Sequence, residues 1–164
     1  MPRTCSIARS LEVVGERWAL LVIREVSLGV RRFSGIQAAT GAPPAVLSAR
    51  LRDLVAAGLL ETRPYQEPGT RSRFEYRLTA EGRSLQPVLT ALKDWGDVHI
   101  CDERGVPVIT RHLGCGAPVH AALMCDQGHL VQAGELRAEP QVHEPEKVVM
   151  SGYGTAGDES STMG

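Results

Sequence analysis

The sequence has few aromatic residues, and it has no apolar run of the length that crosses a membrane. Phe, Trp and Tyr make up 4% of the 164 residues, although 43% of the residues are hydrophobic. The apolar run from Trp18 to Ile23 is closely bracketed by charged residues and is too short to span a bilayer. We therefore expect no membrane segment. The length suits a cored domain of about 100 residues with an appendage, and it argues against a two-lobed enzyme.

The sequence also lacks a recognisable export signal. No basic segment with a following small-residue cleavage site precedes the first apolar run, so we do not expect secretion. In a chain that is not exported, structural disulfides are not expected, and the default location is the cytoplasm. This expectation covers all four cysteines, Cys5, Cys101, Cys115 and Cys125.

A strong net charge is missing as well, which at first argues against binding to nucleic acid. The net charge of the whole chain is -1. The charges are segregated, however: residues 1–100 carry 14 Lys and Arg against 10 Asp and Glu, and residues 101–164 carry 4 against 9. A basic first part with an acidic last part is typical of a DNA-binding domain joined to an appendage that does not bind DNA.

Residues 31–82 hold the most informative pattern in the chain. Phe33–Ala39 is predicted to form a short helix, and Thr40–Ala42 a turn in which glycine is free to adopt a positive φ. Pro43 and Pro44 suit the first turn of a second helix, where a missing N–H costs nothing. Two strands follow. This order predicts a helix-turn-helix with a wing, a unit that presents one helix to the DNA major groove.

The second helix of this unit has two different faces. Leucines and a glycine recur along one face at spacings of three and four, which indicates a buried stripe of Leu47, Leu51, Leu54 and Gly58. The opposite face carries Ala45, Ser48, Ala49 and Arg52. Arginine can pair with guanine, serine with several base edges, and alanine can contact a thymine methyl group. We predict that this face reads bases; the alternative is an ordinary solvent-exposed helix face.

The strands of the predicted wing are Leu59–Tyr65 and Arg73–Leu78, with the tip at Gln66–Ser72. Arginines lie at this tip and just before the helix-turn-helix, the two places where such a fold meets the DNA backbone. A further arginine lies on the flank of the second helix. We predict phosphate contacts from Arg31, Arg32, Arg50, Arg71 and Arg73.

Helices are also predicted on both sides of this unit. Ser6–Val14 and Arg17–Ser27 precede it, and the second of these is apolar on most faces, which indicates a central position in the core. After the wing, Thr79 can cap a helix that continues at helical spacing to His99. Pro87 lies inside this pattern and is expected to kink or split it near its start.

Beyond residue 100 the helical periodicity is lost. We expect a small β-rich extension over residues 101–138, with strands at Val106–His112, Ala122–Cys125 and Leu130–Leu136. From residue 139 to 164 the chain is rich in Pro, Gly, Ser and acids, which predicts a disordered tail. Residues 1–100 would then form the DNA-binding and dimerisation domain.

The chain resembles the HxlR-type winged-helix transcriptional regulators, which are distant relatives of the MarR regulators. The matching segments run in order from Cys5 to Asp97: LEVVGERWALLVIREV, GVRRFSGI, LSARLRDLVAAGLLETRPY, FEYRLTAEGRSL and LTALKDWGD. The resemblance implies an α+β fold, a winged helix-turn-helix whose N- and C-terminal helices pair in a homodimer. It departs from the family's minimal domain in the two prolines that start the second helix and in the longer extension.

We therefore expect a regulator, most simply a repressor, that binds double-stranded DNA as a homodimer. Two-fold symmetry predicts a pseudo-palindromic operator with half-sites about one helical turn apart. The competing hypothesis is a winged helix that docks proteins, with the extension as the partner surface. The basic first part and the arginines of the wing favour DNA.

Two further features suggest ligand chemistry. Some relatives in the family sense oxidants through a cysteine near the N-terminus, and Arg3 and Arg9 could favour the Cys5 thiolate electrostatically. The alternative is a packed, inert thiol. The second feature is a cluster of Cys and His that could close a tetrahedral structural zinc site, with the ligands His112, Cys115, Cys125 and His129.

The alternative to zinc is a metal-free hairpin, because the spacing is not that of a standard finger and Gly128 stands where a knuckle would have its second cysteine. No other cofactor is expected. A catalytic metal site is not predicted either, since the nearest acid in the cluster, Asp126, lies on an expected turn and no nucleophile and base are paired.

Overall fold

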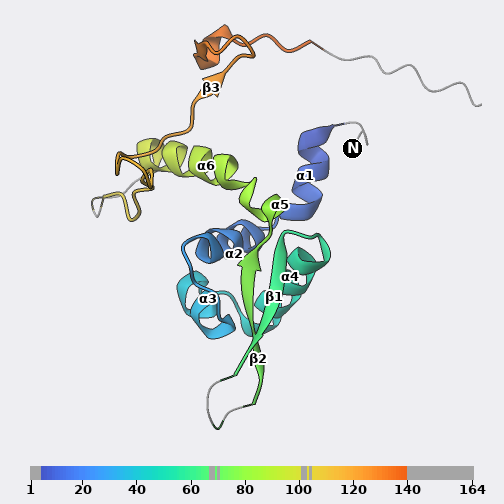
Figure 1. The fold of residues 1–164 in the computed structure, drawn as a ribbon. Helices are drawn as coiled ribbons and strands as arrows, with labels where there is room; N and C mark the ends of the chain where they lie inside the picture. Colours follow the sequence, from blue (N-terminus) through green and yellow to red (C-terminus); the bar gives the residue numbers. More distant parts are fainter. Residues whose placement is uncertain (1–4, 67–68, 70, 101–102, 104, 140–164) are drawn as a thin grey trace, which may run out of the picture.

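The computed structural model of the protein describes residues 5–66, 69, 71–100, 103 and 105–139. The described residues up to 100 form helices with one antiparallel hairpin, which confirms the α+β class and the winged helix-turn-helix (Figure 1). The elements are α1 (Ser6–Val14), α2 (Arg17–Ser27), α3 (Phe33–Thr40), α4 (Pro44–Ala56), β1 (Leu60–Tyr65), β2 (Arg73–Leu78), α5 (Ala80–Arg83) and α6 (Gln86–His99).

The turn of the helix-turn-helix is built as the sequence predicts. Gly41 has a φ of 71°, a conformation that glycine adopts without steric cost, and it ends α3. Helix α3 runs one residue further than predicted, because the Thr40 hydroxyl donates to the Ile36 carbonyl oxygen at 2.8 Å and accepts from the Ala42 N–H at 3.2 Å. Pro44 then begins α4, where its missing N–H leaves no bond unmade.

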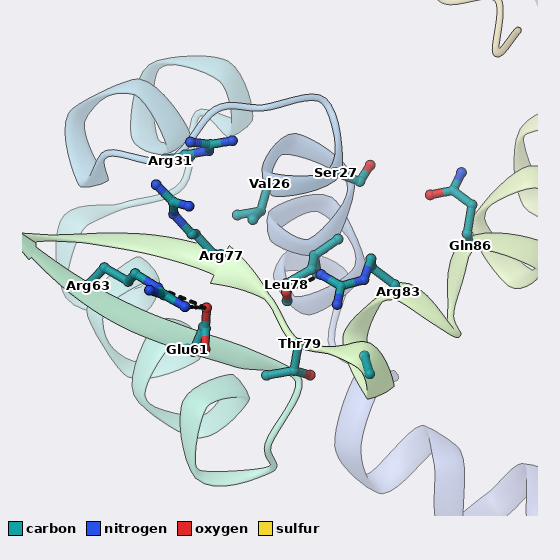
Figure 2. Close-up of a pocket in the computed structure, with 11 residues that line it drawn as sticks. Val26, Ser27, Arg31, Glu61, Arg63, Arg77, Leu78, Thr79, Arg83 and Gln86 are labelled. Atoms are coloured by element: carbon teal, nitrogen blue, oxygen red, sulfur yellow. Dashed lines mark hydrogen bonds and ion pairs between the residues drawn. The ribbon is translucent and has the colours of Figure 1, made fainter. Parts of the chain in front are cut away.

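The wing is a two-stranded antiparallel hairpin with one apolar and one charged face. Leu60 pairs with Leu78 and Thr62 with Tyr76; Leu60, Tyr76 and Leu78 pack on the helices, whereas Thr62 is exposed. On the other face Glu61 lies opposite Arg77, and Figure 2 shows these side chains on neighbouring strands. The chain before α3 joins this sheet edge, since the Tyr76 N–H donates to the Arg31 carbonyl oxygen at 2.8 Å.

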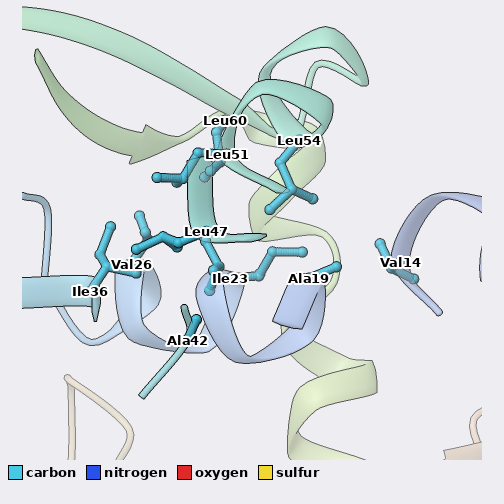
Figure 3. Close-up of a cluster of buried hydrophobic side chains, with 11 residues drawn as sticks. Val14, Ala19, Ile23, Val26, Ile36, Ala42, Leu47, Leu51, Leu54 and Leu60 are labelled. Carbon is cyan, nitrogen blue, oxygen red and sulfur yellow. The ribbon is translucent and has the colours of Figure 1, made fainter. Parts of the chain in front are cut away.

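The core lies between α2, α3, α4 and the wing (Figure 3). The predicted stripe is buried: Leu47, Leu51 and Leu54 are each at most 1% exposed, and they pack with Ile23 and Ile36, which are fully buried. Gly58 lies beyond the end of the helix. The burial of an aliphatic side chain contributes about 1.5–3 kcal/mol, so this cluster fixes the rotation of α4 about its axis.

The segment after the wing confirms two predictions. The Thr79 hydroxyl accepts from the Gly82 N–H at 3.0 Å, which caps α5. Gly82 is buried, and a Cβ at this position would collide with the Leu59 carbonyl oxygen. The helical pattern is split at Ser84 and Leu85, and α6 begins with Pro87 in its first turn, where proline is tolerated.

The extension has less strand than predicted. The predicted strand Val106–His112 is wrong: apart from an isolated bridge between Arg111 and Pro118, no ladder forms there among the described residues. The other two predicted strands shrink to β3 (Leu123–Met124) and β4 (Leu130–Val131), and a 3-10 helix, η1 (Ala133–Glu135), follows. Residues 140–164 of the predicted disordered tail, and Cys101, lie outside the described residues.

Replacing Leu51 by alanine tests the buried stripe. We expect the free energy of unfolding to fall by about 2–5 kcal/mol, because the change removes buried methyl groups and leaves a cavity. Chemical denaturation followed by circular dichroism measures it. Val46→Ala on the same helix, where the side chain is 37% exposed, serves as the control and should change stability by about 0.5 kcal/mol or less. Equal losses in the two variants would contradict the assigned packing.

Candidate nucleic-acid interface

The outer face of α4 presents small and polar side chains to solvent. Ala45, Ser48 and Arg52 are exposed, whereas Ala49 is only half-exposed and lies at the border of this face. The Arg52 Nε atom donates to the Ser48 carbonyl oxygen at 3.3 Å, so the guanidinium group lies back along the helix towards its N-terminus. With the leucine stripe buried behind it, this helix can approach another surface closely along this face.

The predicted phosphate contact at Arg50 is already engaged within the protein. Its Nη2 atom lies 3.0 Å from the Asp53 Oδ2 atom, and its side chain is 27% exposed. Arg50 therefore stands on the flank of α4 as predicted, but a phosphate would have to compete with Asp53 for its charge.

The arginines before α3 and in the wing that were predicted to bind phosphate lie at the surface. Arg31, Arg32, Arg71 and Arg73 are all exposed. The Arg32 guanidinium carbon lies 4.5 Å from the centroid of the Tyr65 ring, a cation–π contact between the start of α3 and the end of β1. This contact and the bridge between Arg32 and Glu75 place the segment before α3 against the wing.

The sequence analysis missed the charged face of the wing. Arg63 bonds to Glu61 at 3.0 Å, and Arg77 bonds to Glu75 at 2.6 Å, each within its own strand. The signal was present in the sequence, because Arg and Glu alternate at every second position in both strands, which places them on one face. Of the arginines in the wing, only Arg71 and Arg73 were predicted to bind DNA.

Cys5 is exposed and immediately precedes α1. Its carbonyl oxygen accepts from the Arg9 N–H at 3.1 Å, which starts the helix. Figure 1 shows α1 and α6 on the side of the molecule away from the wing tip. Both helices expose large apolar side chains there: Ile7, Leu11, Val88, Leu92, Trp95 and Val98. We call this set the terminal-helix face.

The predicted zinc ligands form two local pairs. The His112 Nδ1 atom lies 3.2 Å from the Cys115 Sγ atom, and the Cys125 N–H donates to the His129 carbonyl oxygen at 3.0 Å. The backbone N–H groups of His129 and then Gln127 lower the pKa of the Cys125 thiol. Within the described part of the chain, however, no three His, Cys, Asp or Glu side chains gather closely enough to hold a metal ion. The four-ligand site is therefore not assembled here.

The extension is attached to α6 through Asp94. One carboxylate oxygen of Asp94 accepts from the Ala121 N–H at 2.7 Å, and the other lies 3.4 Å from the His120 Nδ1 atom. The hydrogen bond from Lys93, followed by the one from Ala121, lowers the pKa of Asp94 to about 2. The carboxylate is therefore charged at neutral pH.

The fold and this interface define a winged helix-turn-helix DNA-binding protein. The family model described as HxlR-like helix-turn-helix matches residues 13–104. An uncharacterized HTH-type transcriptional regulator of Mycobacterium tuberculosis strain H37Rv is 41% identical over 136 residues, which cover 82% of this chain and 85% of that protein. A regulator of Synechocystis is 35% identical over 103 residues, 60% of this chain and 75% of its own. The chain belongs to the HxlR-like helix-turn-helix family.

Two solved structures extend the similarity beyond the winged helix. PA1607, assigned as a transcription factor, matches with a TM-score of 0.73 and 31% identity over 85% of this chain and 97% of its own. PA1374 from Pseudomonas aeruginosa matches with a TM-score of 0.57 and 34% identity over 87% and 96%. Matches of this extent cannot fit within residues 1–104, so they include part of the extension.

The protein is a transcriptional regulator with a helix-turn-helix DNA-binding fold. Its family is not a class of enzymes. Among the helices in the described residues, none has the length and apolar character needed to cross a membrane.

Proposed function

We propose that the protein binds a pseudo-palindromic operator in the cytoplasm as a homodimer and represses transcription from it. The main observation in favour of this proposal is that α4 has one buried face and one exposed face. Its leucine stripe is buried, while Ala45, Ser48 and Arg52 are exposed on the opposite face. Short outward side chains allow a helix to lie deep in the major groove, and Arg52 is long enough to reach a guanine edge. A dimer that covers promoter DNA would exclude polymerase from it.

The arginines around the wing support the same proposal in a different role. Contacts to phosphates fix the register of a protein on DNA without reading sequence. Arg31 at the start of α3 and Arg71 and Arg73 in the wing are exposed and flank α4 along the chain. We therefore expect α4 to read the bases and the arginines on either side of it to bind the DNA backbone.

The terminal-helix face supports the homodimer. Leu92 and Trp95 are 51% and 57% exposed, and Ile7 and Leu11 are 72% and 56% exposed, at helical spacings that place each pair on one side of its helix. Large exposed apolar patches mark interaction sites in proteins. A second copy of the chain is the occupant that two-fold operator symmetry requires.

Two arginine variants separate base reading from backbone binding. Arg52→Ala should cost about 1–3 kcal/mol of discrimination at one base position and leave binding to unrelated DNA nearly unchanged. Arg71→Ala should weaken binding to all sequences alike and reduce the slope of log affinity against log salt by about 1. Fluorescence anisotropy on the DNA upstream of the protein's own gene, and on a scrambled duplex, over a series of salt concentrations, measures both effects.

Arg137→Ala is the matched control, because this side chain is exposed in the extension. It should behave as the unchanged protein does. Affinity that does not depend on salt, or capture of protein partners with no binding to DNA, would contradict the proposal and favour a protein-docking winged helix.

A charge in the terminal-helix face should break the homodimer. Leu92→Glu is expected to give a monomer, because the carboxylate would be buried without a partner, and to lose most of the operator affinity, since one half-site binds alone. Light scattering after size-exclusion chromatography measures the mass. Leu113→Glu is the control. It makes the same change at a fully exposed leucine of the extension, outside the terminal-helix face. A dimeric Leu92→Glu protein with full affinity would refute the assigned face.

Control by oxidation through Cys5 is a second part of the proposal. Two observations favour it: the thiol is exposed beside α1, and the fold is similar to the redox regulator HypR in its reduced form, with a TM-score of 0.51 and 27% identity over 56% of this chain and 90% of that one. Because Cys5 adjoins a helix of the terminal-helix face, its oxidation would alter the packing of that helix.

Operator binding measured before and after hydrogen peroxide treatment tests this control. We expect oxidant to reduce the affinity of the unchanged protein by at least about tenfold, equivalent to about 1.4 kcal/mol. Cys5→Ser should remove the response, whereas Cys125→Ser should keep it. A response that survives in Cys5→Ser, or disappears in Cys125→Ser, would assign sensing elsewhere.

A further inference from the structure

A cleft rich in arginine lies beside the charged face of the wing. It has a volume of about 860 Å³ and is bordered by the end of α2, both strands, α5 and the first residue of α6. Four arginines from four segments line it: Arg31, Arg63, Arg77 and Arg83. Among the described residues of the lining, Glu61 is the only acid. Figure 2 shows these side chains around the opening.

Two of the four charges are balanced inside the protein. Arg63 lies 3.0 Å from Glu61, and Arg77 lies 2.6 Å from Glu75, which stands just outside the lining. These pairs lie on the sheet, where the register of the strands holds their backbones in place.

The other two charges are not balanced. The Arg83 Nη1 atom donates to the Leu78 carbonyl oxygen at 2.7 Å, which orients the guanidinium group and leaves its charge. For the Arg31 side chain, no hydrogen-bond or ion-pair partner exists among the described residues, although its backbone is tied to β2 through Tyr76. Two uncompensated positive charges therefore share one hollow, and each guanidinium group keeps donors free.

Guanidinium groups bind phosphate and carboxylate through paired, charge-assisted hydrogen bonds. Like charges in a partly enclosed cleft repel each other, and a bound anion with two or more charges relieves that repulsion. We propose that this cleft binds a small multivalent anion carrying phosphate or carboxylate groups, held by Arg31 and Arg83 and bordered by Arg77.

The position of the cleft gives such an anion a route to DNA binding. Arg31 adjoins α3, Arg77 belongs to the wing, and Arg83 lies in α5, which leads into α6 and the terminal-helix face. An anion held by these residues links the helix-turn-helix and the wing to α6, the helix through which we expect two chains to pair. This effect on DNA rests on the proposed function above, whereas binding of the anion does not. A phosphate of bound DNA offers the same chemistry, so the test separates the two sources.

The first experiment measures the anion without DNA. The full-length protein is titrated with inorganic pyrophosphate, and separately with citrate, by calorimetry at constant ionic strength. We expect saturable binding of at least one of them, one anion per chain. Arg31→Gln and Arg83→Gln should each weaken it by at least about tenfold, the effect of losing a hydrogen bond to a charged group. Arg137→Gln should bind as the unchanged protein does.

Two further measurements separate loss of anion binding from loss of folding: binding by the Arg83→Lys variant, and thermal unfolding of each variant without anion. The lysine variant retains the charge and should recover part of the affinity that glutamine loses. A variant that melts far below the unchanged protein is replaced by Arg77→Gln, which removes a charge at the border of the same cleft. No saturable binding of either anion, or equal weakening by Arg137→Gln, would overturn the proposal.

The second experiment separates a free anion from a DNA phosphate. Anisotropy with the upstream duplex is measured with and without the anion that binds in the first experiment. We expect Arg83→Gln to bind DNA normally in anion-free buffer, with an unchanged salt slope, and to lose the response to the anion. A lower affinity and a salt slope reduced by about 1 would place a DNA phosphate in the cleft and overturn the small-anion assignment. If the protein binds the anion saturably but binds no DNA, the proposed anion site stands and only the proposed operator binding is contradicted.

Discussion

The packing of the leucine stripe of α4 against α2 and α3 is the contact on which the rest of the structure depends. Helix α4 begins with two prolines and carries small side chains on its outer face, so little besides this stripe determines its orientation. Because Leu47, Leu51 and Leu54 must all be buried, the helix has one rotation about its axis, and Ser48 and Arg52 face outwards as a consequence. The face available to DNA is therefore set by apolar burial, without any contribution from the polar residues that would use it.

The second constraint is the sheet edge formed by Arg31 and Arg32. By pairing with β2, this segment brings the start of α3 to the charged face of the wing, so that arginines distant in sequence share one surface. Several of them are used within the fold: Arg32 on Tyr65, Arg50 with Asp53, and Arg77 with Glu75. A nearly neutral chain can in this way keep a basic surface, because its acids pair with some arginines while others, such as Arg31, have no ion-pair partner among the described residues.

Local patterns in the sequence were enough for the winged helix but not for the extension. The helices, the turn at Gly41 and the split before Pro87 each depend on neighbours within a few residues, and all three are confirmed. The strand predicted at Val106–His112 is reduced, in the described residues, to the bridge between Arg111 and Pro118 with one backbone hydrogen bond on either side, and Pro107 has no N–H to donate to a longer ladder. Zinc binding by His112, Cys115, Cys125 and His129 stays a prediction. The side chains of His112 and Cys115 meet within one turn, but local spacing says nothing about their distance from Cys125 and His129.

The extension is best understood as an addition to the terminal helices and not to the DNA-reading unit. Solved structures that match 85% and 87% of the chain include part of it, so PA1607 and PA1374 share part of the extension. Its described contact with α6 centres on Asp94, whose pKa of about 2 lies below the usual carboxyl value. Because its pKa is lowered, the charged Asp94 stabilises the attached state at any pH above the pKa of an unfolded aspartate. This stabilisation is lost as the pH falls from that pKa towards 2. The Asp94 carboxylate therefore keeps its charge near neutrality. Because Asp94 lies one residue before Trp95, a ligand of the extension would act first on the surface through which we expect two chains to pair.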